Sequence, residues 1–297
     1  VENDPALIVD STMVIDDVDS PDFATGTLKV SIASGSVTTD RLVIVAEGTG
    51  AGQVGLTGTN ITFGGVVVGT YSGGFTTSGM LTITFNASAT PAIAQSVARR
   101  IGFLNAGDNP GATVRTISFI LTDGDGGTSA TKTRSVSVTG VNDGPTLGSF
   151  GSAVSYTENT AAGTIISSTI TVTDPDSANF DTGILTVSLP VGATAADLLE
   201  IKHTGTAAGQ VGVSGANVTY GGVVIGTFTG GTAGTSLVIT FNTSSTLAAV
   251  QAVAKSVTFK VVGAISANSS RTVRFSLSDG DGGFSLNVDK TINVINV

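Results

Sequence analysis

The chain has 297 residues, a net charge of -9 and no cysteine. The lack of cysteine excludes disulfides, cysteine–zinc sites and cysteine nucleophiles, and the acidic balance argues against a nucleic-acid partner. Hydrophobic residues make up 40% of the chain, too many for a disordered protein. No apolar run reaches the roughly 20 residues that span a membrane, so we expect no membrane insertion.

An internal repeat is the strongest feature of the sequence. The segment Val54–Gly65 recurs as Val211–Gly222, and Asp123–Gly127 recurs as Asp279–Gly283. The repeat predicts two domains, 1–140 and 141–297. Glu158 aligns with Glu2, so the first copy is expected to lack about fifteen amino-terminal residues and to be a segment of a longer array.

Most of each repeat is predicted to form short strands. In chain order, Leu28–Ile32 alternates apolar with polar residues, and Gly64–Gly65 is typical of a tight turn between strands. Residues 114–121 and 133–138 flank Asp-Gly turn signals and predict a hairpin. The sequence therefore predicts an all-β protein of two tandem β-sandwiches, with about seven to nine strands in each.

One short crossover helix is expected in each repeat. Thr90 is a suitable N-cap and is followed by Pro91 at the first helical position. An apolar stripe then runs through Ile93, Val97 and Ile101. The second repeat is expected to repeat this cap and stripe with Thr246, Val250, Val253, Lys255 and Val257. Arg99 and Arg100 are expected to complement the dipole at the end of the first helix.

Acidic residues gather in loops at the ends of these elements. Carboxylates two residues apart in a loop can point their oxygens at one cation, and calcium takes six to eight oxygen ligands, including amide oxygens. Without a cation, such neighbours repel one another. The sequence therefore predicts calcium as the cofactor, with the metal ligands drawn from Glu2, Asp17, Asp19, Asp123, Asp125, Asn142, Asp143, Asp174, Asp176, Asp279 and Asp281.

Topology suggests which of these groups meet. If the Asp174–Asp176 loop joins the second and third strands of its repeat, it lies at the end where the chain enters the domain, together with Asn142–Asp143 and the Asp279–Asp281 hairpin. Glu2 is expected to face the linker from the first repeat. The alternative is that the Asp-Gly-Asp-Gly-Gly segments are ordinary hairpin turns and the aspartate pairs are solvated loop caps.

These motifs resemble a known family. The linker Val-Asn-Asp-x-Pro at 141–145, the Asp-Pro-Asp-Ser loop at 174–177 and the glutamate at 158 are similar to the calcium motifs of cadherin repeats. The whole unit looks more like the cadherin-like repeats of giant bacterial RTX-type adhesins. The resemblance implies cadherin- or immunoglobulin-like sandwiches in an extracellular, cell-surface rod, stiffened by calcium for adhesion or biofilm formation. An Asp-Arg-Glu triplet typical of eukaryotic cadherins is absent, and the resemblance implies one or two ions per linker.

Other functions are weighed against this one. The sequence shows no convergent acid–base pair with a nucleophile, so we expect no enzyme activity within these residues. The expected partners are neighbouring repeats of the same chain, with a cell-surface protein or polysaccharide as the adhesion target. The alternative function is a carbohydrate-binding or accessory module of a secreted multidomain enzyme, although the chain has 3 Tyr and no Trp with which to build a sugar platform.

Overall fold

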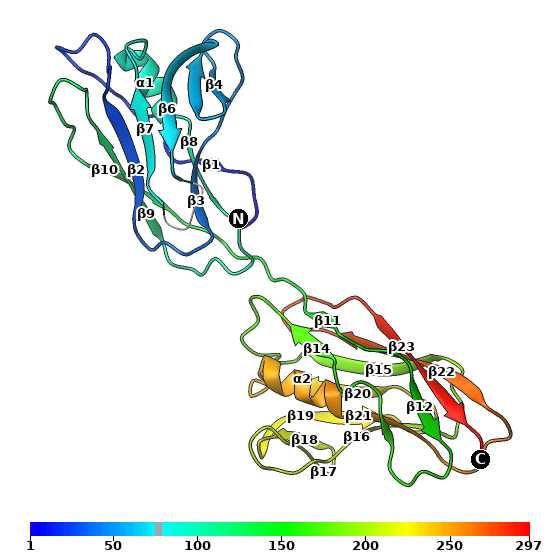
Figure 1. Ribbon diagram of the computed structural model, residues 1–297. Helices are drawn as coiled ribbons and strands as arrows, with labels where there is room; N and C mark the ends of the chain where they lie inside the picture. Colours follow the sequence, from blue (N-terminus) through cyan, green and yellow to red (C-terminus); the bar gives the residue numbers. More distant parts are fainter. Residues whose placement is uncertain (75–78) are drawn as a thin grey trace. The chain divides into compact units, whose positions relative to one another are not determined.

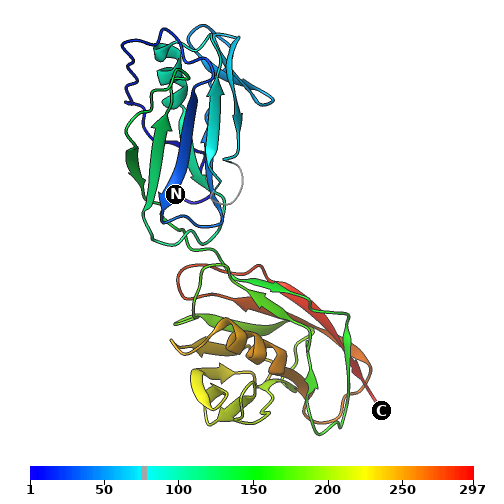
Figure 2. The ribbon, with the colours of Figure 1, turned by 60° about the vertical axis from the view of Figure 1, so that its left-hand side comes forward.

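The computed structural model describes residues 1–74 and 79–297. The chain divides into two compact units, Val1–Val141 (unit 1) and Asn142–Val297 (unit 2), and Figures 1 and 2 show each built mainly from strands. Each unit has its own cluster of buried hydrophobic side chains. The prediction of an all-β fold with one short helix per repeat is therefore confirmed for the described residues.

Two sheets form the framework of unit 1. A seven-stranded sheet has the order β10-β9-β2-β7-β6-β5-β4, and a three-stranded sheet has the order β1-β8-β3. The elements are β1 (Leu7–Ile8), β2 (Thr27–Ser34), β3 (Asp40–Ile44), β4 (Val54–Thr57), β5 (Asn60–Phe63), β6 (Val66–Ser72), β7 (Leu81–Phe85), α1 (Pro91–Ala98), β8 (Ile101–Asn105), β9 (Arg115–Leu121) and β10 (Lys132–Val136).

Unit 2 repeats this plan with additional strands. Its sheets have the orders β12-β23-β22-β15-β20-β19-β18-β17, β13-β21-β16 and β11-β14. The elements are β11 (Thr146–Gly148), β12 (Val154–Thr157), β13 (Thr164–Ile165), β14 (Thr171–Thr173), β15 (Ile184–Val191), β16 (Asp197–Ile201), β17 (Val211–Ser214), β18 (Asn217–Tyr220), β19 (Val223–Gly230), β20 (Leu237–Phe241), α2 (Leu247–Ser256), β21 (Val257–Val261), β22 (Ser269–Leu277) and β23 (Val288–Ile295).

The strand count differs from the expectation of seven to nine. The described residues form ten strands in unit 1, β1 to β10, and thirteen in unit 2, β11 to β23. Several of these, such as β1 and β13, contain only two residues. Such short strands carry too little alternation of apolar and polar residues for a sequence pattern to reveal them.

The core of each unit lies between its large and small sheets. In unit 1, Val30 of β2 and Ile83 of β7 come from the large sheet, and Phe103 of β8 comes from the small one. Val97 of α1 is fully buried in the same cluster. In β2 and β7, alternate residues point inward, which is why these strands read as apolar and polar residues in turn.

The predicted helix caps are confirmed, but both helices end earlier than expected. Thr90 Oγ1 accepts the N–H of Ile93 at 3.4 Å, and Thr246 Oγ1 accepts the N–H of Ala249 at 3.3 Å. Ile101 and Val257, predicted as the ends of the helical stripes, are instead the first residues of β8 and β21. Strand residues directly after a helix continued the spacing of four by coincidence.

Arg99 and Arg100 lie beyond the end of α1 and serve the loops around it. The Arg99 Nε donates to the carbonyl of Met13 at 2.7 Å. The Arg100 Nε donates to the carbonyl of Val45 at 2.8 Å, and its guanidinium pairs with Glu47 at 3.1 Å. Both arginines therefore bond to carbonyl groups of neighbouring loops at the end of the helix. They do not lie in its last turn, where they were expected to complement the helix dipole.

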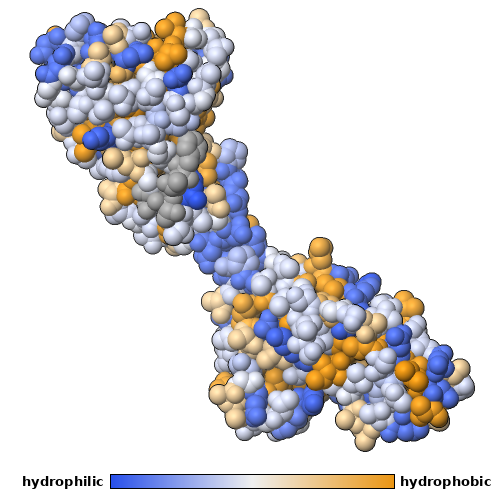
Figure 3. All heavy atoms as spheres, in the orientation of Figure 1, coloured by the Kyte–Doolittle hydropathy of each residue, from blue (hydrophilic) through white to orange (hydrophobic). Residues whose placement is uncertain are grey.

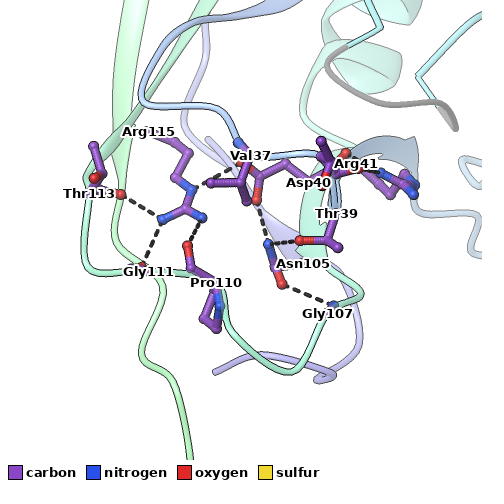
Figure 4. Close-up of polar contacts among 11 residues, drawn as sticks. Val37, Thr39, Asp40, Arg41, Asn105, Gly107, Pro110, Gly111, Thr113 and Arg115 are labelled. Carbon is purple, nitrogen blue, oxygen red and sulfur yellow. Dashed lines mark hydrogen bonds and ion pairs between the residues drawn. The ribbon is translucent and has the colours of Figure 1, made fainter. Parts of the chain in front are cut away.

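A buried ion pair anchors the small sheet of unit 1 (Figure 4). Asp40 Oδ2 lies 3.1 Å from Arg115 Nε, and both side chains are fully buried. Asp40 Oδ1 accepts from Asn105 Nδ2 at 2.7 Å. The remaining guanidinium N–H groups donate to carbonyls of the loop before β9, including that of Thr113 at 2.6 Å. Every charge is thus matched, which offsets the cost of removing the pair from water.

Unit 2 repeats the ion pair without the amide. Asp197 Oδ2 lies 2.7 Å from Arg271 Nε, but Asp197 faces Val261 across the β16–β21 pairing, where Asp40 faces Asn105. Asp197 Oδ1 is consequently buried without a hydrogen-bond partner. The same fold therefore holds one satisfied and one incompletely satisfied charge network.

On the face drawn in Figure 3, hydrophilic and near-neutral residues predominate in unit 1 and hydrophobic residues are scattered among them. Among the described residues, no helix is long and apolar enough to cross a membrane.

Candidate metal centre

The Asp174–Asp176 loop follows β14 and is folded by its own first carboxylate. Asp174 Oδ1 accepts the N–H of Asp176 at 3.3 Å and that of Ser177 at 2.9 Å. Asp174 Oδ2 and Ser177 Oγ are buried and have no partner. The loop joins the fourth and fifth strands of unit 2, not the second and third as expected, because the unit contains additional short strands before it.

The first residues of unit 2 pack against this loop. The N–H of Asp143 lies 3.4 and 3.3 Å from the two carboxylate oxygens of Asp176, and Asp143 Oδ2 is buried without a partner. Burial raises the pKa of Asp176 above its usual value, the N–H of Asp143 opposes the rise, and the negative charges of Asp174 and Asp143 add to it. The carboxylates of Asp174 and Asp143 thus act on Asp176 through their charges, and each keeps one buried oxygen without a donor.

The turn after β22 closes the same end of unit 2. Asp279 is fully buried. Its Oδ1 accepts the N–H groups of Asp281 at 2.8 Å and Gly283 at 3.0 Å, and its Oδ2 accepts from Asn142 Nδ2 at 2.9 Å. Asp279 thus holds its own turn together and also bonds to the first residue of the unit. Asp281 is exposed.

Unit 1 carries the counterpart of this acidic end. Asp17 Oδ1 accepts the N–H groups of Asp19 at 3.3 Å and Ser20 at 3.0 Å, as Asp174 does in unit 2. The pKa of Asp19 is raised mainly by its contact with Asp17 and by that residue's charge, with a further contribution from the charge of Asp123. The N–H of Ser20 lowers the pKa of Asp17. The repeat thus reproduces an aspartate pair beside a third carboxylate.

The Asp123–Gly127 turn has the same local geometry but a more open setting. Asp123 Oδ1 accepts the N–H groups of Asp125 at 2.8 Å and Gly127 at 2.9 Å. Asp123 remains partly exposed and Asp125 is exposed, whereas Asp279 is fully buried beneath Asn142. The group that covers Asp279 is the side-chain amide of Asn142, from the first residue of unit 2.

Glu2 lies at the other end of unit 1, where the chain leaves it. Its backbone N–H donates to the carbonyl of Thr139 at 3.1 Å, and its Oε1 accepts the N–H of Val141 at 2.7 Å. The residue is only 6% exposed, and its Oε2 is buried without a hydrogen-bond partner. In unit 2, the matching Glu158 uses both oxygens, since Oε1 accepts from Val297 at 3.0 Å and Oε2 from Ile265 at 2.7 Å.

The donor chemistry of these residues fits a hard cation such as calcium. Unpartnered buried oxygens remain on Asp143, Asp174 and Glu2, and carboxylate oxygens are the ligands that calcium prefers. Within residues 1–74 and 79–297, however, no three acidic or histidine side chains form a group ready to hold a metal ion. The acidic ends are therefore arrangements of close pairs whose side chains must converge further to surround an ion.

Two participants in this region were not predicted from the sequence. Ser177 has an unpartnered hydroxyl in the Asp174 turn, and its counterpart Ser20 occupies the same place in unit 1, so the repeat itself carried the signal. Gly283 gives room to the turn, since a Cβ there would lie 2.1 Å from Asp279 Oδ2. That closeness depends on the folded path of the chain and has no sequence signature beyond the glycine.

No family model matches the chain, and no curated protein matches it by sequence. Among solved structures, human CDH23 EC21-23 is similar with a TM-score of 0.27 and 12% identity, covering 91% of this chain and 58% of that one. Drosophila N-cadherin EC1-3 gives 0.24 and 11%, covering 89% and 57%. The collagen adhesin of S. aureus gives 0.20 and 11%, covering 91% and 81%. The chain thus spans somewhat over half of the first two structures, and likenesses at these scores assign neither family nor function.

Proposed function

We propose that the chain is a calcium-binding structural module of an extracellular adhesin, a non-enzymatic spacer in which calcium stiffens the segment that leads into each repeat. In this proposal, the acidic end of unit 2 binds the ion through Asp143, Asp174 and Asp176, with Asn142 and Asp279 beside them. Adhesion or biofilm formation and a bacterial RTX-type setting are the wider role that the sequence motifs favour.

The observation that carries the proposal is the set of buried oxygens without donors. Asp143 Oδ2 and Asp174 Oδ2 are both buried and unpartnered, and both carboxylates raise the pKa of Asp176 through their charges. A buried carboxylate without a partner is costly, and a cation would relieve the repulsion and the missing bonds together. An ordinary solvated loop would instead expose these oxygens to water.

The residues of the set would have distinct tasks. Asp174 keeps its loop folded with one oxygen and offers the other, and Asp143 brings a carboxylate from the first residues of unit 2 to that loop. An ion bound by both would tie residues 142–143 to the body of the unit. Glu2, whose Oε2 is unpartnered while its Oε1 accepts from Val141, is proposed as a cation ligand at the end of unit 1.

Small-angle X-ray scattering tests the stiffening. The chain in calcium should give a narrower distribution of interatomic distances than the same chain in excess chelator, and Asp174→Ala should give the chelator profile under both conditions. Glu200→Ala removes one negative charge from an exposed position on β16 and should behave as the unaltered chain. Identical profiles of the unaltered chain with and without calcium would count against the proposal.

A further inference from the structure

Unit 2 carries an exposed aromatic ring beside a hollow on its large sheet. Phe284 follows the turn after β22 and is 76% exposed. No other phenylalanine that the structure describes is exposed to this degree. The residue lines a hollow of about 390 Å³ together with residues of β15 and β22, and small-molecule sites in proteins range from about 300 to 1,000 Å³. The hollow is therefore large enough for a small ligand.

Backbone pairing sets this ring in a row with two neighbours. Ile184 and Ser278 exchange backbone hydrogen bonds at 3.2 and 3.0 Å, and Ser278 in turn forms an antiparallel bridge with Phe284. In the next row, Thr186 lies opposite Ser276. Residues directly opposite one another on antiparallel strands share a face of the sheet. Because β15 and β22 bury their alternate residues, these five side chains lie on the face that is turned away from the core.

The polar side chains of the hollow have unused hydrogen-bonding capacity. Thr186, Ser276 and Asn287 line it and make no side-chain hydrogen bond to any residue that the structure describes. Ser278 Oγ accepts the N–H of Ile184 at 3.0 Å, which leaves the hydroxyl hydrogen of the serine to be donated. The hollow thus offers both donors and acceptors beside an apolar ring.

The hollow is lined by uncharged residues. None of the described residues around it is acidic or basic, although the chain as a whole has a net charge of -9. Two residues before Ser276 on β22, the guanidinium of Arg274 donates to both carboxylate oxygens of Asp289 at 2.7 and 2.8 Å. The charges on this border are therefore matched. A neutral ligand would meet no unpaired charge here, and an anionic ligand would find no cation to hold it.

The matching positions of unit 1 have a different chemistry. Thr128 forms the bridge that Phe284 forms in unit 2. Lys29 lies opposite Ile120, where unit 2 has two hydroxyl side chains opposite each other. The backbone pairing is the same in both units, so the fold itself does not require the ring and the hydroxyl groups of unit 2.

Sugar rings combine the two properties that this lining matches. Their hydroxyl groups donate and accept hydrogen bonds, and their C–H groups can pack against the negative face of an aromatic ring. A lipid or an apolar peptide would instead cover Thr186, Ser276 and Asn287 without giving them partners, which is costly. The chemistry of the hollow therefore favours a neutral sugar over an apolar partner.

We propose that this hollow of unit 2 is a binding site for a neutral oligosaccharide. The ring of Phe284 packs against the C–H face of one sugar residue, and the side chains of Thr186, Ser276 and Asn287 bond to its hydroxyl groups. The site gives unit 2 a ligand that is separate from calcium and does not depend on it.

Nuclear magnetic resonance of the isotope-labelled chain tests the site. The probes are oligosaccharides of glucose, galactose, mannose, xylose and N-acetylglucosamine, each added in chelator so that the result is independent of any calcium site. At least one of them should shift the backbone amides of Thr186, Ser276 and Phe284 in a saturable manner. The amides of the matching residues of unit 1, Lys29 and Thr128, should not shift.

Two variants give unit 2 the residues that unit 1 has at these positions. Phe284→Thr removes the ring, and Ser276→Ile removes a hydroxyl group and fills part of the hollow. Each should weaken binding of that oligosaccharide at least about fivefold. Leu286→Ala is the matched control, because Leu286 is 88% exposed in the same loop but is not among the residues that line the hollow. The control should bind as the unaltered chain does.

Two kinds of result would overturn the proposal. One is the absence of a saturable shift with every sugar, or equal binding by the unaltered chain and both variants. The other is binding of the chain to phosphatidylcholine vesicles that is lost in Phe284→Thr and in Leu286→Ala alike, since the loop would then be a lipid-binding tip.

Discussion

Asn142 donates its side-chain amide to Asp279 Oδ2 at 2.9 Å, and this bond joins the first residue of unit 2 to the turn after β22. The two residues are 137 positions apart in the chain. The amide covers a carboxylate that is fully buried, so the start of the unit forms part of its acidic end. The matching turn in unit 1, at Asp123, is partly exposed.

Replacing Asn142 should therefore weaken unit 2 in the absence of metal. Asn142→Ala would leave Asp279 Oδ2 without its side-chain donor, and the loss of a partner from a buried charged group costs about 1–3 kcal/mol. Chemical denaturation of the chain in chelator measures the change. Gly140→Ala, which adds a methyl group only two residues away, is the matched control. Equal stability of Asn142→Ala and the unaltered chain would show that the bond contributes nothing.

In the absence of metal, the charged form of Asp176 should lower the stability of unit 2. Burial raises its folded pKa above 3.8, aided by Asp174 and Asp143. The folded state then binds more protons than the unfolded state, so this group makes stability fall as pH rises from about 3.8 through its folded pKa. Asp176→Asn should remove that fall and raise the melting temperature in chelator at pH 7 by a few degrees.

The same substitution should have the opposite effect in calcium, because it removes a charged ligand. The rise in melting temperature on adding calcium should be smaller for Asp176→Asn than for the unaltered chain. Thermal scans in the two buffers separate the effects. A substitution that lowers stability in chelator, or leaves the calcium shift unchanged, would contradict this account of Asp176.

The two buried ion pairs differ in the residue opposite the aspartate, and swapping these residues should have opposite effects on the stability of the two units. Val261→Asn should give Asp197 Oδ1 the donor that Asn105 supplies to Asp40, and a new bond to a charged group contributes about 1.5–3 kcal/mol. Asn105→Val should cost unit 1 about 1–3 kcal/mol for the reverse reason. Denaturant titrations that resolve the two units would check both changes, and a loss of stability in both variants would reject the comparison.

Glu158 should stabilise unit 2 in a manner that depends on pH. The N–H of Ile265, followed by that of Val297, lowers its pKa below 4.5, so its contribution is complete above about pH 4.5 and is lost as pH falls through the folded pKa. Glu158→Gln should therefore be less stable than the unaltered chain at pH 7, with the difference shrinking in acid. A difference that stays constant from pH 7 to pH 3 would contradict this assignment.

The sequence predicted those features that depend on local pattern or on repetition. Thr90 and Pro91 located the start of α1, and the Asp-Gly signals located the β9–β10 hairpin. The helix ends were misplaced because Ile101 extends an apolar spacing of four into a strand. Spacing alone cannot separate a buried helix residue from a buried strand residue that follows it.

The buried ion pairs escaped prediction because a charged residue in a strand is usually exposed. Asp40 and Arg115 are 75 positions apart, so their contact depends on the folded topology. The repeat did contain a clue, since Asp197 and Arg271 recur at the matching positions. For the acidic ends, the sequence named the aspartates, but which oxygens are covered by backbone N–H groups and which remain unpartnered is visible only in the folded loops.

Isothermal calorimetry with calcium chloride tests the central claim most directly. The chain, first stripped with chelator and then dialysed free of it, should bind calcium with a dissociation constant of about 10⁻³ M or tighter. Asp174→Asn should weaken binding at least about tenfold, since a charged ligand is lost. Glu200→Gln, which makes the same change of charge on an exposed part of β16, should bind as the unaltered chain does. The absence of saturable heat in the unaltered chain, or equal binding by all three proteins, would contradict the account.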